Sequence, residues 1–421
     1  MRSTTLKSAE FKTTGTANIF VMVAKKILRQ KISSLPSGCI AIKDELDAWQ
    51  TDVSREPDFT IEVHDLRFYV DVLLAGSNGA ASAYRDGYWS CDNLVGLFQL
   101  MVRNLDNADQ LESGLAALGN WWLRRRHQSR SNTRQGSQKN IHAHYDLGND
   151  MFQLFLDNTM TYSSGIFLNK QSSLEEASIE KLDRICRKLD LKAHHKLIEI
   201  GSGWGSFSIH AAKNYGCHVT TITISKEQYT LAKERIAEQG LTDLIDIRLC
   251  DYRDLTGKFD KLVSIEMIEA VGDEYLPAYF SSCASLLKED GQMLIQAITM
   301  PDQRYKQYLK SSDFIQQFIF PGSCVPSLTA MVDAVTKGSD LRINHVEEFG
   351  LDYATTLRVW RANFNARLDE VKQQGYGDDF IRLWEYYLCY CEAAFLERYT
   401  GVVHMLMNKP GNGRQAISSS H

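Results

Sequence analysis

Residues 197–205 read Leu-Ile-Glu-Ile-Gly-Ser-Gly-Trp-Gly, and this stretch decides the fold. The apolar run before the glycines predicts a buried strand, and residues 206–214 after them predict a helix. Three glycines at alternate positions let the chain turn tightly and bring backbone N–H groups against a ligand at the carboxyl end of the strand. The stretch therefore predicts a ligand-binding strand–loop–helix unit.

The residues beside the glycines indicate which ligand binds there. A dinucleotide site has the spacing GxGxxG and an acidic residue about 20 positions later. This chain has GxGxG, and the next predicted strand ends at 223–225 without an acidic residue. A carboxylate stands instead at Glu199, where it can hold the loop amides or the ammonium group of a ligand. The pattern favours S-adenosylmethionine (SAM) over a dinucleotide, and Asp251, beyond the third strand, is placed to meet the adenine.

Apolar strand candidates and helical runs alternate on both sides of the glycine loop. The strands are expected at 196–200, 216–224, 244–250, 259–265 and 291–297, with helices at 226–239 and 274–287 between them. This rhythm predicts an α/β fold with a mostly parallel, doubly wound sheet and right-handed crossovers. The fold class is thus a Rossmann-like class I SAM methyltransferase with helical additions. Past residue 299 the helical signal dominates, including one long run over 378–407.

The N-terminal part of the chain predicts a small α/β domain of its own. Residues 59–63 alternate as a strand, Gly76 and Gly79 mark a turn, and residues 92–102 form an amphipathic pattern. We expect this domain to cover residues 1–115. A basic linker follows at 116–140, then the catalytic domain at 141–410 and a disordered tail at 411–421.

Composition excludes several classes of protein. The chain has 421 residues, is 44% hydrophobic and carries 47 Lys+Arg against 52 Asp+Glu, so neither disorder nor a nucleic-acid partner is indicated. Its longest apolar runs hold about half a dozen residues, whereas a transmembrane helix needs about 20. No secretory signal is evident, and the protein is expected in the cytoplasm. The nine cysteines include no CxxC pair, which favours reduced thiols and no metal site.

Seven motifs, in addition to the glycine loop, carry a family resemblance. They are HYDLGNDM (144–151), FLDNTMTYSSGIF (155–167), TISKEQ (223–228), SIEMIEAVG (264–272), DFIQQFIFPG (313–322), DYATTLRVW (352–360) and YYLCYCEAAF (386–395). From about residue 142 to 410 the chain resembles the cyclopropane-fatty-acyl-phospholipid synthase family, which includes the mycolic acid cyclopropane synthases. Residues 66–104 also resemble the small N-terminal domain of its phospholipid-acting members.

The resemblance implies transfer of a methylene group from SAM to the cis double bond of an unsaturated acyl chain in a membrane phospholipid. Because an alkene is a weak nucleophile, the sulfonium methyl must be held in line with it in a dry pocket. The addition creates a carbocation, which aromatic faces can stabilise. A base then removes a proton so that the ring closes. In the family this base is proposed to be a bound bicarbonate.

The resemblance also implies the catalytic residues. The anion would be held by Glu269, Tyr353, the backbone of Ile298, Ser164 in place of the usual cysteine, and Gln296 in place of the usual histidine. Serine and glutamine can both donate hydrogen bonds to an anion. The two replacements leave open a fatty-acyl C-methyltransferase with a methyl-branched or methylene product, and a non-catalytic lipid-binding relative.

Two further residues need an interpretation. Glu266, three residues before Glu269, is interpreted as structural or solvated. Cys391 aligns with a cysteine sometimes given a catalytic role in the family, but a thiol on an aromatic-rich helix is more often a small buried hydrophobe.

The cofactor-binding residues are carried over from the same motifs, with Gln228 expected near the ribose. They are Tyr162, Ser163, Glu199, Gly201, Gly203, Trp204, Gly205, Thr223, Ser225, Gln228, Asp251 and Tyr252.

The expected partner is a lipid bilayer. Anionic head groups attract each nearby Lys or Arg by about 1 kcal/mol, and the basic linker would supply such residues. The protein is therefore expected to be peripheral on the inner face of the membrane, and the resemblance implies a homodimer. The helix over 380–395 is expected to form core or an acyl tunnel, and His142 and His144 to make local hydrogen bonds.

Overall fold

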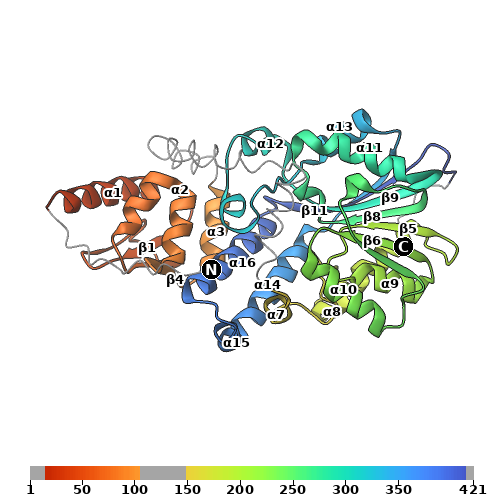
Figure 1. Ribbon diagram of the computed structural model, residues 1–421. Helices are drawn as coiled ribbons and strands as arrows, with labels where there is room; N and C mark the ends of the chain where they lie inside the picture. The colour runs from red at the N-terminus through yellow and green to blue at the C-terminus, as the bar shows by residue number, and fades with distance from the viewer. Residues whose placement is uncertain (1–14, 105–147, 414–421) are drawn as a thin grey trace. The chain divides into compact units, whose positions relative to one another are not determined.

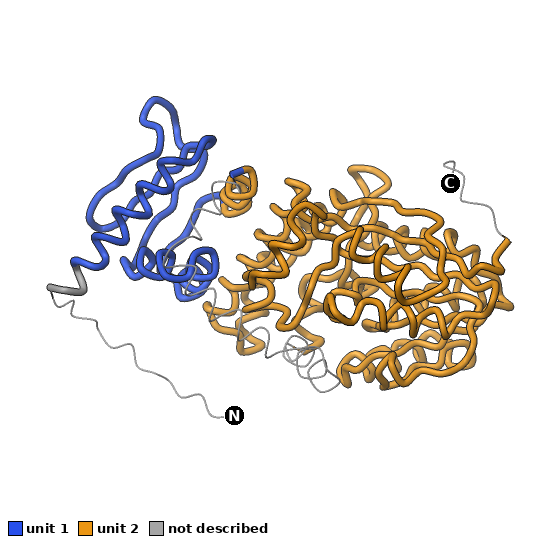
Figure 2. Tube along the Cα trace, turned by 90° about the horizontal axis from the view of Figure 1, so that it is seen from above, with its two compact units in different colours: residues 1–93, 104–119 blue, residues 94–103, 120–421 orange. Residues whose placement is uncertain are grey.

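The computed structural model describes residues 15–104 and 148–413, which form two compact units (Figure 2). Unit 1 contains the described residues 15–93 and 104, and unit 2 contains 94–103 and 148–413. The predicted boundary at 115, the basic linker 116–140, His142, His144 and the tail beyond 413 lie outside the described residues. Among those that are described, no helix is both long enough and apolar enough to cross a membrane.

Unit 1 is a four-stranded sheet with two helices. Its elements are α1 (Gly15–Ser33), β1 (Ile40–Lys43), β2 (Ala48–Gln50), β3 (Phe59–Val63), α2 (Arg67–Arg85) and β4 (Trp89–Cys91), and its strand order is β2-β1-β3-β4. The predicted strand 59–63 is β3. The turn predicted at Gly76 and Gly79 is confirmed at Gly76, whose φ of 56° interrupts α2 and divides it into two parts. A Cβ on Gly79, in the second part, would lie 2.0 Å from the Asp71 carbonyl oxygen in the first, so the two parts pack closely together.

Unit 2 is built on a seven-stranded sheet in the order β10-β11-β9-β8-β5-β6-β7 (Figure 1). The strands are β5 (Lys196–Ile200), β6 (His218–Thr223), β7 (Ile245–Leu249), β8 (Phe259–Ile265), β9 (Leu287–Thr299), β10 (Arg342–Glu348) and β11 (Gly401–Asn408). Strands β5 to β9 pair in parallel, whereas β11 is antiparallel to both β9 and β10. The predicted doubly wound sheet is confirmed, and two antiparallel strands extend one edge of it.

Helices of unit 2 cover both faces of this sheet, and others pack beside it. The helices of the unit are α3 (Leu94–Arg103), α7 (Asn149–Gln153), α8 (Leu174–Leu189), α9 (Ser206–Tyr215), α10 (Lys226–Glu238), α11 (Leu276–Leu286), α12 (Asp302–Tyr308), α13 (Leu328–Gly338), α14 (Gly350–Ala366), α15 (Leu368–Gln373) and α16 (Asp378–Leu396). Short 3₁₀ turns occupy 252–254, 268–270 and 273–275, and a π-helical turn occupies 315–319.

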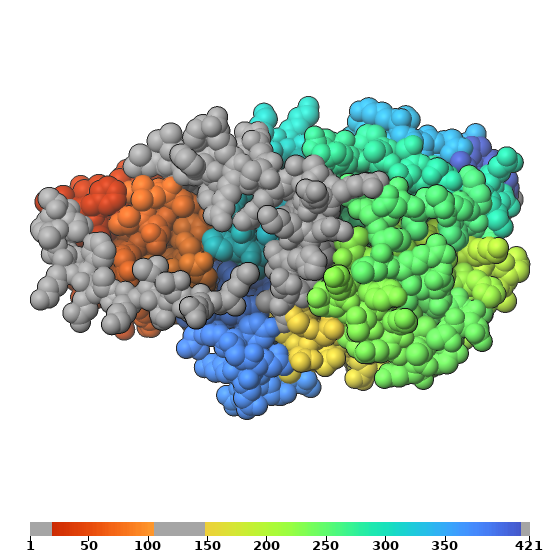
Figure 3. All heavy atoms as spheres, in the orientation of Figure 1, coloured from red at the N-terminus to blue at the C-terminus, as the bar shows by residue number. Residues whose placement is uncertain are grey.

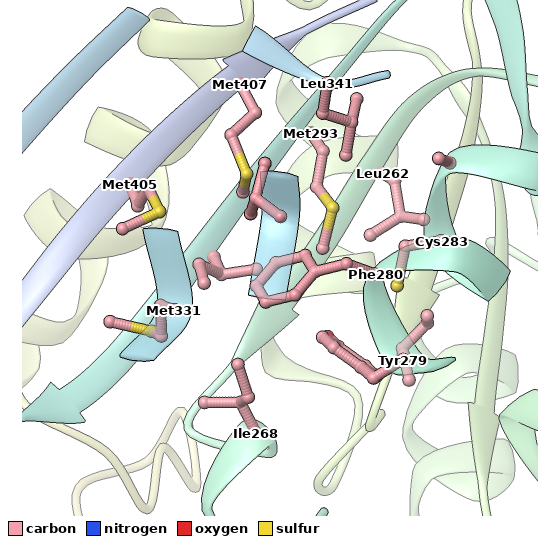
Figure 4. Packing of buried hydrophobic residues seen from close by; sticks show 14 of the residues in the cluster. Leu262, Ile268, Tyr279, Phe280, Cys283, Met293, Met331, Leu341, Met405 and Met407 are labelled. Carbon is pink, nitrogen blue, oxygen red and sulfur yellow. The ribbon is translucent and has the colours of Figure 1, made fainter. Parts of the chain in front are cut away.

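The strands alternate between two hydrophobic clusters because successive side chains point to opposite faces of a sheet. Leu197, Val263 and Leu294 pack with α8, α9 and α10. Their neighbours Ile198 and Leu262 pack with α11 and α13 on the other face, in a methionine-rich cluster (Figure 4). In Figure 1, α9 and α10 lie below the sheet and α11 and α13 above it, and Figure 3 shows the same view with all heavy atoms.

The long helix expected over 378–407 is wrong in its last third. Helix α16 ends at Leu396, and Gly401–Asn408 forms β11, which pairs with β9 along its length. This strand is buried on both faces, so its sequence shows no alternation, and a short apolar run cannot be told from a helix by periodicity.

The predicted helix at 92–102 is α3, but it packs in unit 2 rather than in unit 1. The ring of Phe98 lies 4.8 Å from that of Tyr386 and 5.7 Å from that of Tyr390 on α16. Arg103 forms an ion pair of 2.6 Å with Glu397 at the end of α16. Within the predicted domain 1–115, residues 94–103 therefore belong to unit 2, and this helix supports the catalytic unit.

Candidate active site

A cavity of about 350 Å³ lies at the carboxyl ends of β5, β6 and β8 in unit 2. Its walls come from the loops after these strands, from residues 160–163, and from α14 and α16. It is lined by fourteen of the predicted residues: Tyr162, Ser163, Glu199, Gly201, Gly203, Trp204, Thr223, Gln228, Asp251, Tyr252, Glu269, Ile298, Tyr353 and Cys391. The other four, Ser164, Gly205, Ser225 and Gln296, each donate or accept a hydrogen bond with a lining residue.

The glycine loop has the conformation that its sequence predicts. Gly201, Gly203 and Gly205 have φ values of 95°, 49° and 87°, in the left-handed region that a side chain disfavours. The N–H groups of Gly201 and Ser202 donate to the Ile222 carbonyl at 3.1 and 2.8 Å, which ties the loop to β6. The loop is thus fixed at the mouth of the cavity before any ligand binds.

Glu199 is buried beside this loop. Its Oε2 accepts hydrogen bonds from the hydroxyls of Thr221, at 2.5 Å, and Ser208, at 2.9 Å. Burial raises the pKa of this carboxyl to about 7. The predicted role of holding the loop amides does not apply to three of them, because the Gly201 and Ser202 N–H groups donate to Ile222 and the Gly205 N–H donates to the Ser202 carbonyl. The role that fits is to receive the ammonium group of a ligand in the cavity, since a cation would favour the ionised carboxylate.

Three polar residues after β6 hold one another in place. The Thr223 hydroxyl donates to the Gln228 side-chain oxygen at 2.8 Å. Ser225 caps the N-terminus of α10 by accepting from the Gln228 N–H at 3.2 Å. Ser225 therefore positions Gln228, while Gln228 itself lines the cavity.

The opposite side of the cofactor region is also fixed. Asp251, after β7, forms an ion pair of 2.6 Å with Arg253. The residue between them in sequence, Tyr252, also lines the cavity. The indole N–H of Trp204 donates to Asn149 at 2.7 Å, so this buried ring is locked at the end of the glycine loop.

The segment 160–164 adds a tyrosine and a serine to the wall. The hydroxyls of Tyr162 and Tyr387 lie 3.0 Å apart. Ser163 accepts a 2.8 Å hydrogen bond from the buried ammonium of Lys181, whose pKa burial lowers to about 8. Lys181 also lines the cavity, and no motif in the sequence predicted it.

Glu266 is the centre of the acceptor side. Its Oε1 accepts from the Ser164 N–H at 3.0 Å and from the Gln296 amide at 2.7 Å, and its Oε2 accepts from the Tyr353 hydroxyl at 2.7 Å. The residue has φ 46°, a backbone conformation that costs a non-glycine residue about 1–3 kcal/mol. Of the two interpretations of Glu266, the solvated one is wrong, because three predicted catalytic residues donate hydrogen bonds to its carboxylate.

Glu269 has fewer partners. Its Oε1 accepts from the Ile298 N–H at 2.6 Å, while its Oε2 is buried without a hydrogen bond. Burial, together with the negative charge of Glu266, raises the pKa of Glu269 to about 8. Burial raises the pKa of Glu266 as well, but its three donors oppose that rise, so the negative charge of the pair is favoured on Glu266 and the proton on Glu269.

A buried relay holds Gln296 behind the cavity. The Gln296 side-chain oxygen faces His404 Nε2 at 2.9 Å, and His404 Nδ1 faces Lys188 Nζ at 3.0 Å. Burial lowers the pKa of His404, so its ring is neutral. Because Lys188 donates to Nδ1, the proton lies on Nε2 and donates to Gln296. This turns the amide N–H₂ of Gln296 toward Glu266.

One face of α16 forms the apolar wall. Tyr387, Tyr390, Cys391, Ala394 and Phe395 recur at the three- and four-residue spacing of a single helix face. The prediction of core or tunnel for this helix agrees with that position. Burial raises the pKa of the Cys391 thiol, so the neutral thiol acts as part of the wall and not as a nucleophile.

The family model described as mycolic acid cyclopropane synthetase matches residues 132–405. The chain belongs to this family. It is 36% identical over 348 residues to tuberculostearic acid methyltransferase UfaA1 of Mycobacterium tuberculosis, covering 80% of each chain. It is 35% identical over 345 residues to cyclopropane-fatty-acyl-phospholipid synthase of Escherichia coli, covering 80% of this chain and 85% of that one.

A solved member has the same catalytic fold. Mycolic acid cyclopropane synthase CmaA1, in complex with SAH and CTAB, is 30% identical with a TM-score of 0.60 and covers 65% of this chain and 98% of that one. SAM is thus the co-substrate of the present chain, which is a SAM-dependent methyltransferase of the lipid-modifying class.

Bicarbonate does not fit this member of the family. The Ser164 N–H, the Gln296 amide and the Tyr353 hydroxyl already bind Glu266, and the Ile298 N–H binds Glu269. The Ser164 hydroxyl donates to the Gly165 carbonyl at 2.9 Å. An added anion would find no free donor among these groups and would face two carboxyl groups. The sequence signal for this was the paired loss of the usual cysteine and histidine, since both replacements lie beside Glu266.

Proposed function

We propose that this enzyme transfers a one-carbon unit from SAM to the cis double bond of unsaturated acyl chains in membrane phospholipids, forming cyclopropane fatty acids. One observation carries the proposal: the glycine loop, the buried carboxyl pair and the apolar face of α16 line a single cavity. The similarity to the cyclopropane-fatty-acyl-phospholipid synthase of Escherichia coli supports it.

A fatty-acyl C-methyltransferase with a methylene or methyl-branched product is the second candidate. The replacements at Ser164 and Gln296 favour it, as does the similarity to the tuberculostearic acid methyltransferase. Both candidates share the addition of the methyl group to the alkene. They differ in where the proton is lost and in whether a reductant acts afterwards.

When bound, SAM supplies a sulfonium methyl group, and the protein must hold it in line with the alkene and exclude water. We infer that the glycine loop and Glu199 hold the amino-acid end of SAM, and that Asp251 and Gln228 hold the nucleoside end. The rings of Tyr387, Tyr390 and Phe395 line the cavity. Each aromatic face can stabilise a desolvated cation by about 1–2 kcal/mol.

We further propose that the enzyme contacts the cytoplasmic face of a bilayer. Helix α1 contains no acidic residue, and four apolar side chains in its first half are exposed. Basic Lys26 and Arg29 follow, and both are exposed. Apolar insertion beside positive charge suits an anionic lipid surface. The exposed residues are Ile19, Phe20, Met22 and Val23. The homodimer stays a prediction.

The lipids of cells that express the enzyme test the function. Cells rich in monounsaturated phospholipids should be fed methionine with a deuterated methyl group, and their fatty acids analysed by gas chromatography and mass spectrometry. A cyclopropane and a methylene product both retain two of the three deuterons, and so does a methyl branch made by reducing that methylene. The reduced product is distinguished by its mass, because it has two more hydrogen atoms than the cyclopropane. Ozonolysis then separates the methylene product, which still has a double bond, from the cyclopropane. An unchanged acyl profile together with intact SAM binding would contradict the proposal.

A further inference from the structure

Glu266 occupies the position in which the resemblance placed an external anion. We propose that its carboxylate is the base that takes the proton from the methylated lipid cation, in place of bicarbonate. This inference rests on the proposed function and names a catalytic residue for it.

The donors around the carboxylate support this assignment. Ser164, Gln296 and Tyr353 come from three separate parts of the chain, and all three donate to Glu266. They are three of the five groups that the resemblance assigns to holding bicarbonate. A carboxylate and a bicarbonate present the same pair of oxygens on a planar carbon. The side chain of Glu266 therefore supplies, through a covalent link, the group that the donors are arranged to hold.

The charge in the cavity also favours Glu266 over Glu269. A base must be ionised before it acts. Burial raises the pKa of Glu266, but its three donors and the nearby Lys181 ammonium oppose this rise by favouring the ionised form. Glu269 has one donor, and its second oxygen is buried without a partner. Glu269 is accordingly the member of the pair that keeps its proton.

The step balances without any other reactant. The alkene π pair forms the new C–C bond, the C–S bond of SAM breaks, and its electron pair stays on sulfur, which leaves a carbocation on the lipid. Glu266 takes a proton from the added methyl group. The electrons of that C–H bond close the ring or, after a hydride shift along the chain, form an exocyclic double bond. Glu266 returns the proton to water when the products leave. A saturated methyl branch would need a further two-electron reductant.

The backbone makes a clean test possible. Glu266 has φ 46°, so glycine is favoured at this position, and Glu266→Gly should fold while it leaves the three donors facing a space of carboxylate size. Asp190→Gly is the matched control, because Asp190 is also an acidic residue at positive φ, 51°, but lies exposed at the end of α8.

The purified full-length enzyme should be assayed on monounsaturated phospholipid vesicles in buffer freed of carbonate. We expect the wild type and Asp190→Gly to keep full activity there. Glu266→Gly should lose roughly 10²–10⁴-fold in kcat, the range found for general bases, with unchanged SAM binding by calorimetry. Added formate or bicarbonate should restore a measurable part of this loss. Glu266→Gln, which fills the space, should lose as much and should not be rescued.

Three results would overturn the assignment: a wild type that needs bicarbonate, a Glu266→Gly variant that stays active without an added anion, or a Glu266→Gln variant within about threefold of the wild type. Failure of the proposed function looks different. In that case the wild type itself binds SAM but adds no carbon to the lipid under any buffer.

Discussion

The cofactor side and the acceptor side of the cavity differ in how far apart their residues lie in the sequence. On the cofactor side, Glu199 and the three glycines lie within seven consecutive residues, and their backbone geometry follows from their sequence. On the acceptor side, Ser164, Gln296 and Tyr353 come from distant segments and meet at Glu266. Adjacent residues fix one another's roles through the backbone. For residues brought together only by folding, the role depends on which partner each one reaches.

The largest expected effect tests which carboxyl group of the acceptor side acts. Glu266→Gln removes the ionised group and should lower kcat by roughly 10²–10⁴-fold. Glu269→Gln keeps an acceptor for the Ile298 N–H and replaces a group that is protonated near neutral pH, so it should lose less. Single-turnover rates with both variants measure the difference. A larger loss in Glu269→Gln than in Glu266→Gln would contradict this assignment and favour Glu269, the residue that the motifs indicated.

The cofactor side should respond in SAM affinity and not in chemistry. Gly201→Ala places a Cβ at φ 95° and 3.3 Å from the Met267 side chain, inside the SAM loop. We expect a loss of about 10-fold or more in SAM affinity, since strain of this kind costs about 1–3 kcal/mol. Gly240→Ala is the control, because it has φ 66° with open space around it, away from the cavity. Calorimetry should find normal SAM binding in the control, and equal losses in both variants would contradict a specific role for the loop.

The buried carboxyl pair also makes stability depend on pH. The pKa of Glu269 rises from an ordinary 4.5 to about 8 on folding. Between these values the unfolded chain has lost a proton that the folded chain retains, so stability falls as pH rises through this window. The slope from this residue is at most about 1.4 kcal/mol per pH unit. In thermal unfolding from about pH 5 to pH 8, the stability of Glu269→Gln relative to the wild type should increase as the pH rises. A constant difference across this range would contradict burial of a protonated carboxyl.

The smallest effect concerns His404, which positions Gln296 from behind the cavity. His404→Leu removes the donor to the Gln296 oxygen and frees the amide to turn, so the donor to Glu266 is lost part of the time. We expect kcat to fall several-fold, by the ~1 kcal/mol of one neutral hydrogen bond, with unchanged KM for lipid. His404→Gln can still donate and should recover most of the rate. A fall in KM and kcat together in both variants would indicate a packing role only.

The fold followed from the sequence where the periodicity was clear. The predicted strands 196–200 and 259–265 have the bounds of β5 and β8, because apolar runs beside glycines and turns are unambiguous. Strand β11 was missed because it is apolar on both faces and follows a helix, and β10 because it is half exposed and mixes charged and apolar residues. The break at Gly76 was predicted, but the helical residues on either side of it were missed, because the glycines and serines there favour turns.

Helix α3 has a practical consequence for anyone who wants the methyltransferase unit alone. The ring of Phe98 packs against Tyr386 and Tyr390 of α16, and Tyr390 also lines the cavity. An expression plasmid that starts after the basic segment would delete residues 94–103 and expose this aromatic surface to water. Truncations and chimaeras between relatives should therefore keep this helix together with the rest of unit 2. This holds even though the helix precedes the predicted basic linker, where a domain boundary would be expected.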